Sequence, residues 1–223
     1  MNKISLNRQS IIKKINDLNE KSTNKESFTT KLVAVSKNQA EYKIDQAIKS
    51  GQRIFGENRV QEAQIRWEGK RKYHKDLELR LIGPLQTNKV KQALNLFDII
   101  ETIDREKLAK QIYKNFHDSV RTKSFYIQIN TGNEIQKSGI STSEADSFIK
   151  FCKNDLKLPI IGLMCIPPQN EEVAMHFCLL KKIANNHNLF ELSMGMSEDF
   201  EEAIKFGATS VRIGSKFFGR RED

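Results

Sequence analysis

The sequence contains few cysteines and no long apolar run. Its three cysteines are Cys152, Cys165 and Cys178; none forms a CxxC pair or lies at zinc-site spacing from a histidine. Such a sparse, odd set is typical of reduced thiols. No apolar segment is long enough to span a bilayer, and the polar segment after Met1 lacks the apolar core of a signal peptide. We therefore expect a soluble, cytoplasmic protein without a metal site.

Blocks of like charge are also missing, although the chain is basic. It carries 37 Lys and Arg residues against 28 Asp and Glu residues, a net charge of +9. An excess of positive charge favours anionic partners, such as phosphate-bearing cofactors, nucleic acids or acidic proteins. However, the basic residues are dispersed among acidic ones and are not interleaved with aromatic residues. Specific nucleic-acid binding is therefore not expected.

Short apolar segments alternate with helical patterns along most of the chain. Residues 1–30 predict a leading helix and a polar linker. Each later strand precedes a helical pattern, which indicates parallel pairing. We predict a single domain over residues 1–223, an α/β fold of the compact (β/α)8 TIM-barrel type with an extra N-terminal helix; a doubly wound open sheet is the alternative. The eight predicted strands are 32–36, 53–55, 79–82, 97–100, 125–130, 158–166, 190–194 and 210–213.

Lys37 follows the apolar run of the first predicted strand. In parallel α/β folds, ligands bind where strands end. A partly desolvated amine has a lowered pKa, so Lys37 is a candidate Schiff-base lysine, and a solvated surface lysine is the alternative. The same mouth should collect the residues that follow the other strands, which include Glu57, Asn58, Gly83, Lys89, Glu101, Thr102, Asn130, Lys137, Met164, Ser197, Arg212, Gly214 and Ser215.

The loops after the seventh and eighth predicted strands have the composition of a phosphate site. Gly195 precedes Ser197 by two residues, and Gly214 directly precedes Ser215. Glycine allows backbone N–H groups to approach an anion, and serine adds a hydroxyl donor. Barrels often bind phosphate with these two loops. Ser197 could also cap a helix beginning at Glu198, which is compatible with anion binding.

A lysine on the first strand and a phosphate site on the last two suggest pyridoxal 5′-phosphate (PLP) as the cofactor. Arg212 would then lie between them, near the pyridine nitrogen. An arginine cannot accept a proton, so it would donate to an unprotonated ring nitrogen, which makes the cofactor a poorer electron sink. A salt bridge between Arg212 and a neighbouring acid is the alternative.

Several motifs together resemble the pyridoxal phosphate homeostasis protein family, also called the YggS/PROSC family. They occur in the family's order over about residues 30–220 and comprise Ala-Val-Ser-Lys (34–37), Phe-Gly-Glu-Asn (55–58), Ile-Gly-Pro-Leu-Gln-Thr-Asn-Lys (82–89), Lys-Ser-Gly-Ile (137–140), Gly-Leu-Met (162–164), Gly-Met-Ser (195–197) and Val-Arg-Ile-Gly-Ser (211–215). One departure is Arg80, which replaces the histidine that usually precedes the Ile-Gly-Pro segment. This family is similar to the N-terminal barrel of alanine racemase, the fold type III group.

The resemblance implies that Lys37 carries PLP as an internal aldimine. It also implies that Ser197, Gly214 and Ser215 hold the phosphate and that Arg212 faces the ring nitrogen. Asn58 is expected to border the ring, and Met164 is included among the cofactor-binding residues.

The resemblance also implies a function. Family members have no established catalytic activity and influence the intracellular pool of PLP. We therefore expect a binding protein that buffers PLP or delivers it to PLP-dependent apoenzymes. We also expect a monomer. Lys89 and Lys137 could take part in transfer as transient acceptors, although a solvated surface role is the simpler interpretation of each.

Two other functions are compatible with parts of the pattern. A single-domain racemase of fold type III would use the same lysine, but two-base racemization needs an acid/base on each face of the ring. None of Tyr42, Tyr73, Tyr113 and Tyr126 has an obvious base role. A sugar-phosphate barrel enzyme would keep the phosphate site and leave Lys37 unused. An absorbance spectrum separates this third function from the other two, because bound PLP is coloured.

Overall fold

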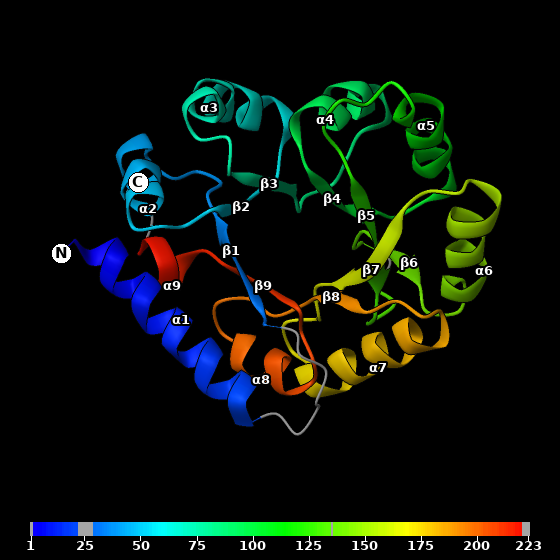
Figure 1. The fold of residues 1–223 in the computed structure, drawn as a ribbon. Helices are drawn as coiled ribbons and strands as arrows, with labels where there is room; N and C mark the ends of the chain where they lie inside the picture. Colours follow the sequence, from blue (N-terminus) through cyan, green and yellow to red (C-terminus); the bar gives the residue numbers. More distant parts are fainter. Residues whose placement is uncertain (1, 22–28, 135, 220–223) are drawn as a thin grey trace.

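Eight parallel strands form a closed barrel in the computed structural model (Figure 1), which describes residues 2–21, 29–134 and 136–219. The strand order β4-β3-β2-β1-β9-β8-β7-β5 closes through pairing of β5 with β4, which confirms the predicted TIM barrel. A two-residue strand, β6, pairs with the end of β5 and was not predicted. The strands are β1 (Lys31–Val35), β2 (Ile54–Glu57), β3 (Glu78–Leu81), β4 (Ile99–Ile103), β5 (Ser124–Asn130), β6 (Ile140–Ser141), β7 (Ile160–Cys165), β8 (Glu191–Ser193) and β9 (Ser210–Ile213).

Helices surround the barrel (Figure 1). The leading helix α1 packs against α2, α8 and α9, which lie near the first and last strands. Most of the predicted linker, residues 22–28, lies outside the described residues. The helices are α1 (Lys3–Lys21), α2 (Glu41–Lys49), α3 (Val60–Tyr73), α4 (Val90–Leu96), α5 (Glu106–Phe116), α6 (Ala145–Lys150), α7 (Val173–Asn186), α8 (Phe200–Lys205) and α9 (Ser215–Phe218), with a 3-10 turn η1 (Thr87–Lys89) and a π-helical turn η2 (Phe151–Asp155).

Side chains alternate along the strands between the surrounding helices and the barrel interior. In β1, Leu32 and Ala34 belong to the main hydrophobic core, whereas Val33 and Val35, although buried, do not. Since Val33 and Val35 share the opposite face of the strand, they point into the barrel. The same parity brings an unusual set of buried polar residues into the interior, namely Arg80, Glu101, Ser193, Ser210 and Arg212.

The fourth strand differs from its predicted position. The apolar segment 97–100 was predicted as the strand, but β4 covers Ile99–Ile103. Glu101 and Thr102 therefore lie within the strand, not in the loop after it, and are buried. The barrel interior is polar at this level, so the strand can carry a carboxylate there. This carboxylate interrupts the apolar run from which the strand was predicted.

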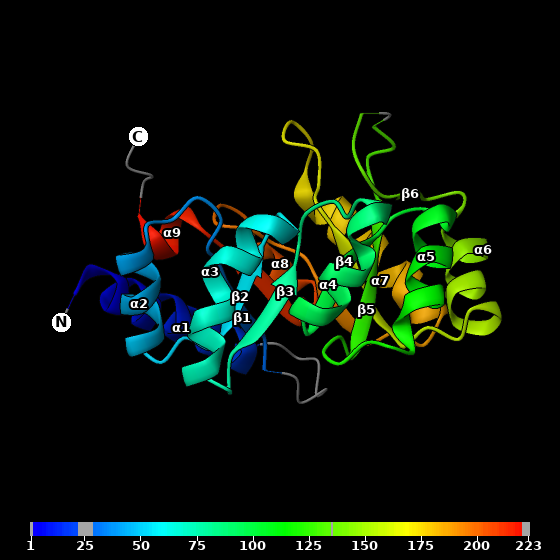
Figure 2. The same ribbon diagram turned by 90° about the horizontal axis from the view of Figure 1, so that it is seen from above.

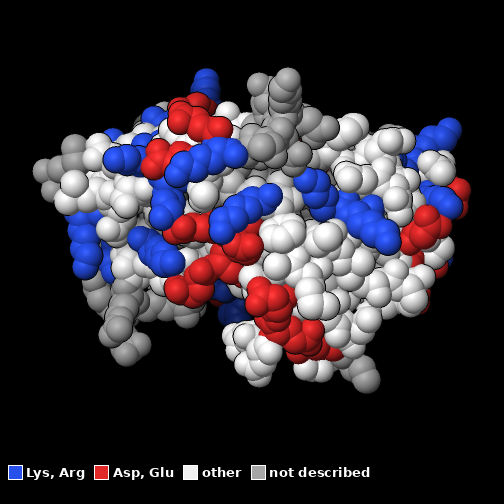
Figure 3. All heavy atoms as spheres, turned by 90° about the horizontal axis from the view of Figure 1, so that it is seen from below, with Lys and Arg blue, Asp and Glu red and all other residues white. Residues whose placement is uncertain are grey.

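Charges of both signs are interspersed on the face of the molecule that Figure 3 shows. Ion pairs also bring opposite charges together on α1 and α8: Lys14 lies 3.1 Å from Glu201, and Lys205 lies 2.8 Å from Glu202. Within the described ranges, no helix combines the length and the apolar character needed to cross a membrane.

Candidate functional site

A cavity of about 870 Å³ opens at the end of the barrel where the strands finish. Its lining includes Lys37, Asn58, Ser197, Arg212 and Ser215, which come from the ends of four different strands and the loops that follow them. Figure 2 shows the loops after β5 and β7 projecting from the end of the barrel that also carries α9. The volume lies within the range of about 300–1,000 Å³ that is usual for small-molecule sites.

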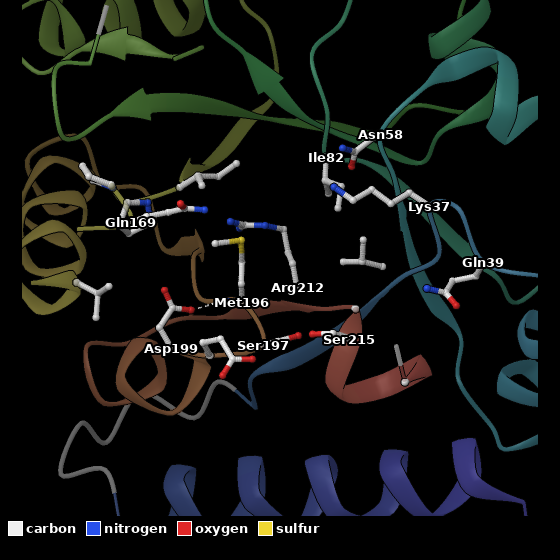
Figure 4. Close-up of a pocket in the computed structure, with 18 residues that line it drawn as sticks. Lys37, Gln39, Asn58, Ile82, Gln169, Met196, Ser197, Asp199, Arg212 and Ser215 are labelled. Carbon is white, nitrogen blue, oxygen red and sulfur yellow. Dashed lines mark hydrogen bonds between the residues drawn. The ribbon is translucent and has the colours of Figure 1, made fainter. Parts of the chain in front are cut away.

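Lys37 is half-buried and lines this cavity. Lys37 follows Val33 and Val35 at the alternate positions whose side chains point into the barrel. In Figure 4 its side chain extends towards Asn58 and Ile82. The preceding residue, Ser36, is fully buried and donates a hydrogen bond of 2.6 Å from its Oγ to Glu57 Oε1. The backbone before Lys37 is thus fixed, while its long side chain reaches into the cavity.

Glu57 was expected in the loop after the second strand, but it is the last residue of β2 and is fully buried. Besides Ser36, its Oε1 atom accepts hydrogen bonds from Arg66 Nη1 at 2.9 Å and Trp67 Nε1 at 3.0 Å. These partners lie on α3, so the carboxylate joins the helix to the loop that carries Lys37. Glu57 supports the site from outside the barrel and does not line the cavity.

Asn58 directly follows β2 and lines the cavity. Its backbone lies against Gly83: a Cβ atom on Gly83 would lie 2.3 Å from the Asn58 carbonyl oxygen. No side chain larger than hydrogen fits between them, which gives a physical reason for glycine in the Ile-Gly-Pro segment. Ile82, which precedes this glycine, also lines the cavity.

Ser197 and Ser215 lie close together at one side of the cavity, with their hydroxyl groups directed towards each other in Figure 4. The Ser197 Oγ atom accepts a long hydrogen bond of 3.4 Å from the Lys216 N–H group. Ser197 does not cap a helix beginning at Glu198, because α8 begins at Phe200 and Asp199 occupies the cap position. The prediction of that cap was wrong, and the hydroxyl lines the cavity instead.

The two glycines near these serines differ in role. Gly195 has a φ of +89°, and a Cβ atom there would lie 2.5 Å from the Ala203 Cβ atom, so this glycine is required by the fold. Gly214 has a negative φ, and a Cβ atom there would meet its nearest neighbour, Val35, at an ordinary 3.5 Å. Gly214 lines the cavity, and its lack of a side chain leaves the backbone beside Ser215 open.

Arg212 lies in β9, is 4% exposed and lines the cavity. Its Nη1 atom donates to Ser193 Oγ at 2.7 Å, and its Nη2 atom donates to the Cys165 carbonyl oxygen at 2.8 Å. No carboxylate forms an ion pair with it among residues 2–21, 29–134 and 136–219, so the salt bridge considered as an alternative is not found there. In Figure 4, Arg212 lies between the two serines and Lys37.

A buried ion pair lies deeper in the barrel, and the sequence did not predict it. Arg80 and Glu101 are both fully buried, and Arg80 Nη1 lies 3.1 Å from Glu101 Oε1. Burial opposes the charge on Arg80, but Glu101, Tyr126 and Glu78 outweigh this effect and raise the pKa of the guanidinium. Arg80 therefore stays charged inside the barrel. The register of β3 and β4 places Arg80 beside Ile99, two residues before Glu101, so the pairing depends on side-chain reach that the local sequence pattern does not reveal.

Three other predicted residues lie at or beyond the edge of the site. Met164 is fully buried inside the barrel with Ile99 and Tyr126 and does not line the cavity. Lys89 ends the η1 turn and also does not line it. Lys137 pairs with Glu134 at 2.5 Å and donates to the carbonyl oxygen of Pro167, a residue that does line it.

The residues around the cavity match the parts of a phosphorylated aldehyde. Two serine hydroxyls and an open glycine backbone suit a phosphate, a buried guanidinium suits a hydrogen-bond acceptor between the ends, and a lysine amine suits an aldehyde. Within the described residues, no group of three or more His, Cys, Asp or Glu side chains is placed to hold a metal ion. The donors therefore fit an organic phosphate.

Comparisons with known proteins identify the family of this chain. Residues 6–222 match the family model of the alanine racemase N-terminal domain. The chain is 36% identical to the pyridoxal phosphate homeostasis protein of Haemophilus influenzae over 211 residues, which cover 90% of this chain and 89% of that protein. It is also 36% identical to the protein of the same name from Escherichia coli K12 over 204 residues, 86% of each chain.

Solved structures of similar proteins show the same fold. PipY of Synechococcus elongatus with PLP bound superposes with a TM-score of 0.78 and 30% identity, covering 94% of this chain and all of that chain. Alanine racemase of Corynebacterium glutamicum gives a TM-score of 0.69 at 17% identity, covering 97% of this chain and 61% of that chain, which shows a shared fold alone. The chain belongs to the pyridoxal phosphate homeostasis protein family and has the fold of the alanine racemase N-terminal domain.

Proposed function

We propose that this protein binds PLP in the cavity at the barrel mouth, attaches it covalently to Lys37 and takes part in PLP homeostasis. The observation that carries the proposal is the placement of Lys37 and the Ser197–Ser215 pair on either side of Arg212 in one cavity (Figure 4). The likeness to PipY, whose structure contains PLP, supports it. When bound, PLP supplies an aldehyde that reacts reversibly with amines.

Each residue of the cavity has a separate task in this proposal. Ser197 and Ser215 donate hydrogen bonds to the phosphate, beside the open backbone of Gly214. Arg212 donates to the unprotonated ring nitrogen, because a guanidinium has no acceptor atom. Asn58 borders the ring, and Lys37 supplies the amine. We assign Met164 to packing inside the barrel and not to cofactor contact.

We infer that the protein is a carrier and not an amino-acid racemase. The relatives named above are called homeostasis proteins and carry no enzyme name. A two-base racemase needs a second acid/base at the cavity, on the other face of the ring from the lysine. Among the described residues no tyrosine lines the cavity, and its two lining carboxylates, Glu198 and Asp199, directly follow Ser197 in the loop of the proposed phosphate site. Burial raises the pKa of Tyr126, which donates to Glu191 Oε2 at 3.2 Å, so Tyr126 is also a poor base.

Delivery to other proteins belongs to the same proposal. We infer that PLP-dependent apoenzymes accept the cofactor from this protein in the cytoplasm and that the carrier acts as a monomer. Lys137 is the better placed of the two candidate transfer lysines, because it contacts Pro167 at the cavity, whereas Lys89 does not line it.

Two measurements test the carrier function. The protein loaded with PLP should restore activity to a cofactor-free PLP enzyme. The loaded protein alone should leave the α-hydrogen of L-alanine and D-alanine unexchanged in deuterium oxide, because proton abstraction must precede racemization. Exchange at an enzyme-like rate that disappears in Lys37→Ala would contradict the carrier function and support the racemase.

A further inference from the structure

A chain of buried hydrogen bonds joins Arg80, deep in the barrel, to Arg212 at the cavity. Glu101 Oε1 faces Arg80 Nη1 at 3.1 Å, and Glu101 Oε2 accepts a hydrogen bond of 2.6 Å from Ser193 Oγ. The same Ser193 oxygen accepts from Arg212 Nη1 at 2.7 Å. All four residues are buried, and the four lie on β3, β4, β8 and β9. We call this set the lumen relay.

The direction of each hydrogen bond in the lumen relay is fixed by chemistry. An arginine can only donate, and an ionised carboxylate can only accept. Ser193 must therefore give its single proton to Glu101, which leaves its lone pairs for Arg212. Without the Glu101 carboxylate, the Ser193 hydroxyl group could rotate. Its lone pairs would then no longer fix the position of the Arg212 Nη1 atom.

The lumen relay places the Glu101 carboxylate between two guanidinium groups that differ in their other partners. Arg80 has a second carboxylate partner, Glu78, whose Oε1 atom lies 2.6 Å from its Nε atom. Arg212 has no ion-pair partner in the described part of the chain, and its contacts inside the barrel are the Ser193 hydroxyl and the Cys165 carbonyl. The negative charge that reaches Arg212 along the lumen relay is that of Glu101, carried through one hydroxyl group.

We propose that Glu101, held by Arg80, is a positioning residue that acts through Ser193 to aim the Arg212 guanidinium at the cofactor's ring nitrogen. The inference rests on the proposed binding of PLP. It also gives a role to Arg80, which stands where the family usually has histidine: in this chain a permanent cation holds the carboxylate at the far end of the relay.

Ser193→Ala tests the relay with little change of volume, and Ser210→Ala is its matched control. Both serines are fully buried, and they are paired in register on β8 and β9. Ser210 Oγ accepts from Arg80 Nη1 at 3.0 Å, so its loss touches the relay only at the far end. The readouts are the affinity for PLP and the ¹⁵N chemical shift of bound PLP labelled at the ring nitrogen.

The relay predicts that Ser193→Ala weakens PLP binding about tenfold, as expected for loss of a hydrogen bond to a charged group. The ring-nitrogen shift should move in the direction given by Arg212→Leu. Ser210→Ala should keep the wild-type shift. Equal shifts in the two serine variants would overturn the relay and leave PLP binding intact, whereas a wild-type protein that does not bind PLP would overturn the proposed function itself.

Glu101→Gln separates the relay from a local effect of Ser193. The relay predicts a ring-nitrogen shift that moves in the same direction as in Ser193→Ala, and a wild-type shift in Glu101→Gln would contradict it. If loss of the Glu101 charge beside Arg80 prevents folding, the double variant Arg80→Met/Glu101→Gln removes the buried cation as well, because a buried pair is often replaceable by uncharged residues. The same shift is expected in the double variant, and a wild-type shift there overturns the relay.

Discussion

Ser36 donates its hydroxyl proton to the buried carboxylate of Glu57, and this 2.6 Å hydrogen bond fixes the residue immediately before Lys37. The carboxylate also accepts from two side chains of α3, Arg66 and Trp67. The loop that presents the lysine is therefore held by a helix on the outside of the barrel. Cofactor attachment and the packing of α3 share one polar cluster.

Replacing the acceptor Glu57 should lower the free energy of unfolding more than replacing the donor Ser36. Glu57→Ala leaves the buried Trp67 indole N–H group without its acceptor, so we expect the free energy of unfolding to fall by about 2–3 kcal/mol. The part-buried Arg66 guanidinium keeps Glu41 and the Gln39 carbonyl oxygen as partners. Ser36→Ala removes one hydrogen bond and should cost about 1 kcal/mol. Urea denaturation of both variants measures the difference. Equal losses would show that the carboxylate is not the centre of the cluster.

Substitution of the two glycines near the serines should separate binding from folding. A Cβ atom at Gly214 meets only ordinary contacts, so Gly214→Val should fold but bind PLP at least about tenfold more weakly, because its side chain blocks the approach of the phosphate. Gly195→Ala should instead lose about 2–4 kcal/mol of stability, because its φ is +89° and its Cβ atom would overlap Ala203.

The control for the Gly214 variant is pyridoxal, which lacks the phosphate. Titration of wild type and variant with both compounds, monitored by absorbance, gives four affinities. The phosphate site requires that wild type prefers PLP over pyridoxal and that Gly214→Val loses most of this preference. Equal affinities of the wild type for the two compounds would exclude a phosphate site at these loops.

The three cysteines should differ in reactivity towards a thiol reagent. Burial raises the pKa of Cys152 and of Cys165 to about 12, whereas Cys178 is exposed. At pH 8 the two buried thiols are protonated as well as inaccessible, so only Cys178 should react rapidly in the folded protein. A chromogenic disulfide reagent should count one fast thiol in buffer and three in denaturant. Fast labelling of Cys165 in buffer would contradict the packing of β7.

Most of the barrel could be predicted from the sequence, because its strands carry apolar residues towards the surrounding helices. The apolar run 32–35 lies within the first predicted strand, and all four of its residues are buried in β1. The strand ends are harder to predict where the inward residues are charged. β4 continues through Glu101, whose carboxylate pairs with Arg80 on the neighbouring strand β3, and a local pattern contains no information about that partner.

The candidate site could be predicted at its mouth but not beneath it. Lys37, Ser197 and Ser215 follow strands, and the rule that barrel loops share one mouth brings them together. Met164 ends the Gly-Leu-Met motif (162–164) and was expected among the cofactor-binding residues, yet its side chain packs with Ile99 and Tyr126 inside the barrel. The hydroxyl of Ser193 is also inside the barrel, where its partners come from strands distant in sequence.

Covalent attachment to Lys37 is most directly tested by borohydride reduction of the PLP-loaded protein, followed by proteolysis and mass spectrometry. We expect the added mass on the peptide that contains Lys37, and loss of both this mass and the cofactor's absorbance band in Lys37→Ala. Since Lys37 is half-buried and follows β1 at the cavity, the variant should still fold, which its far-UV circular dichroism spectrum checks. Recovery of the added mass on a different lysine, or on none, would contradict the assignment of this cavity as the PLP site.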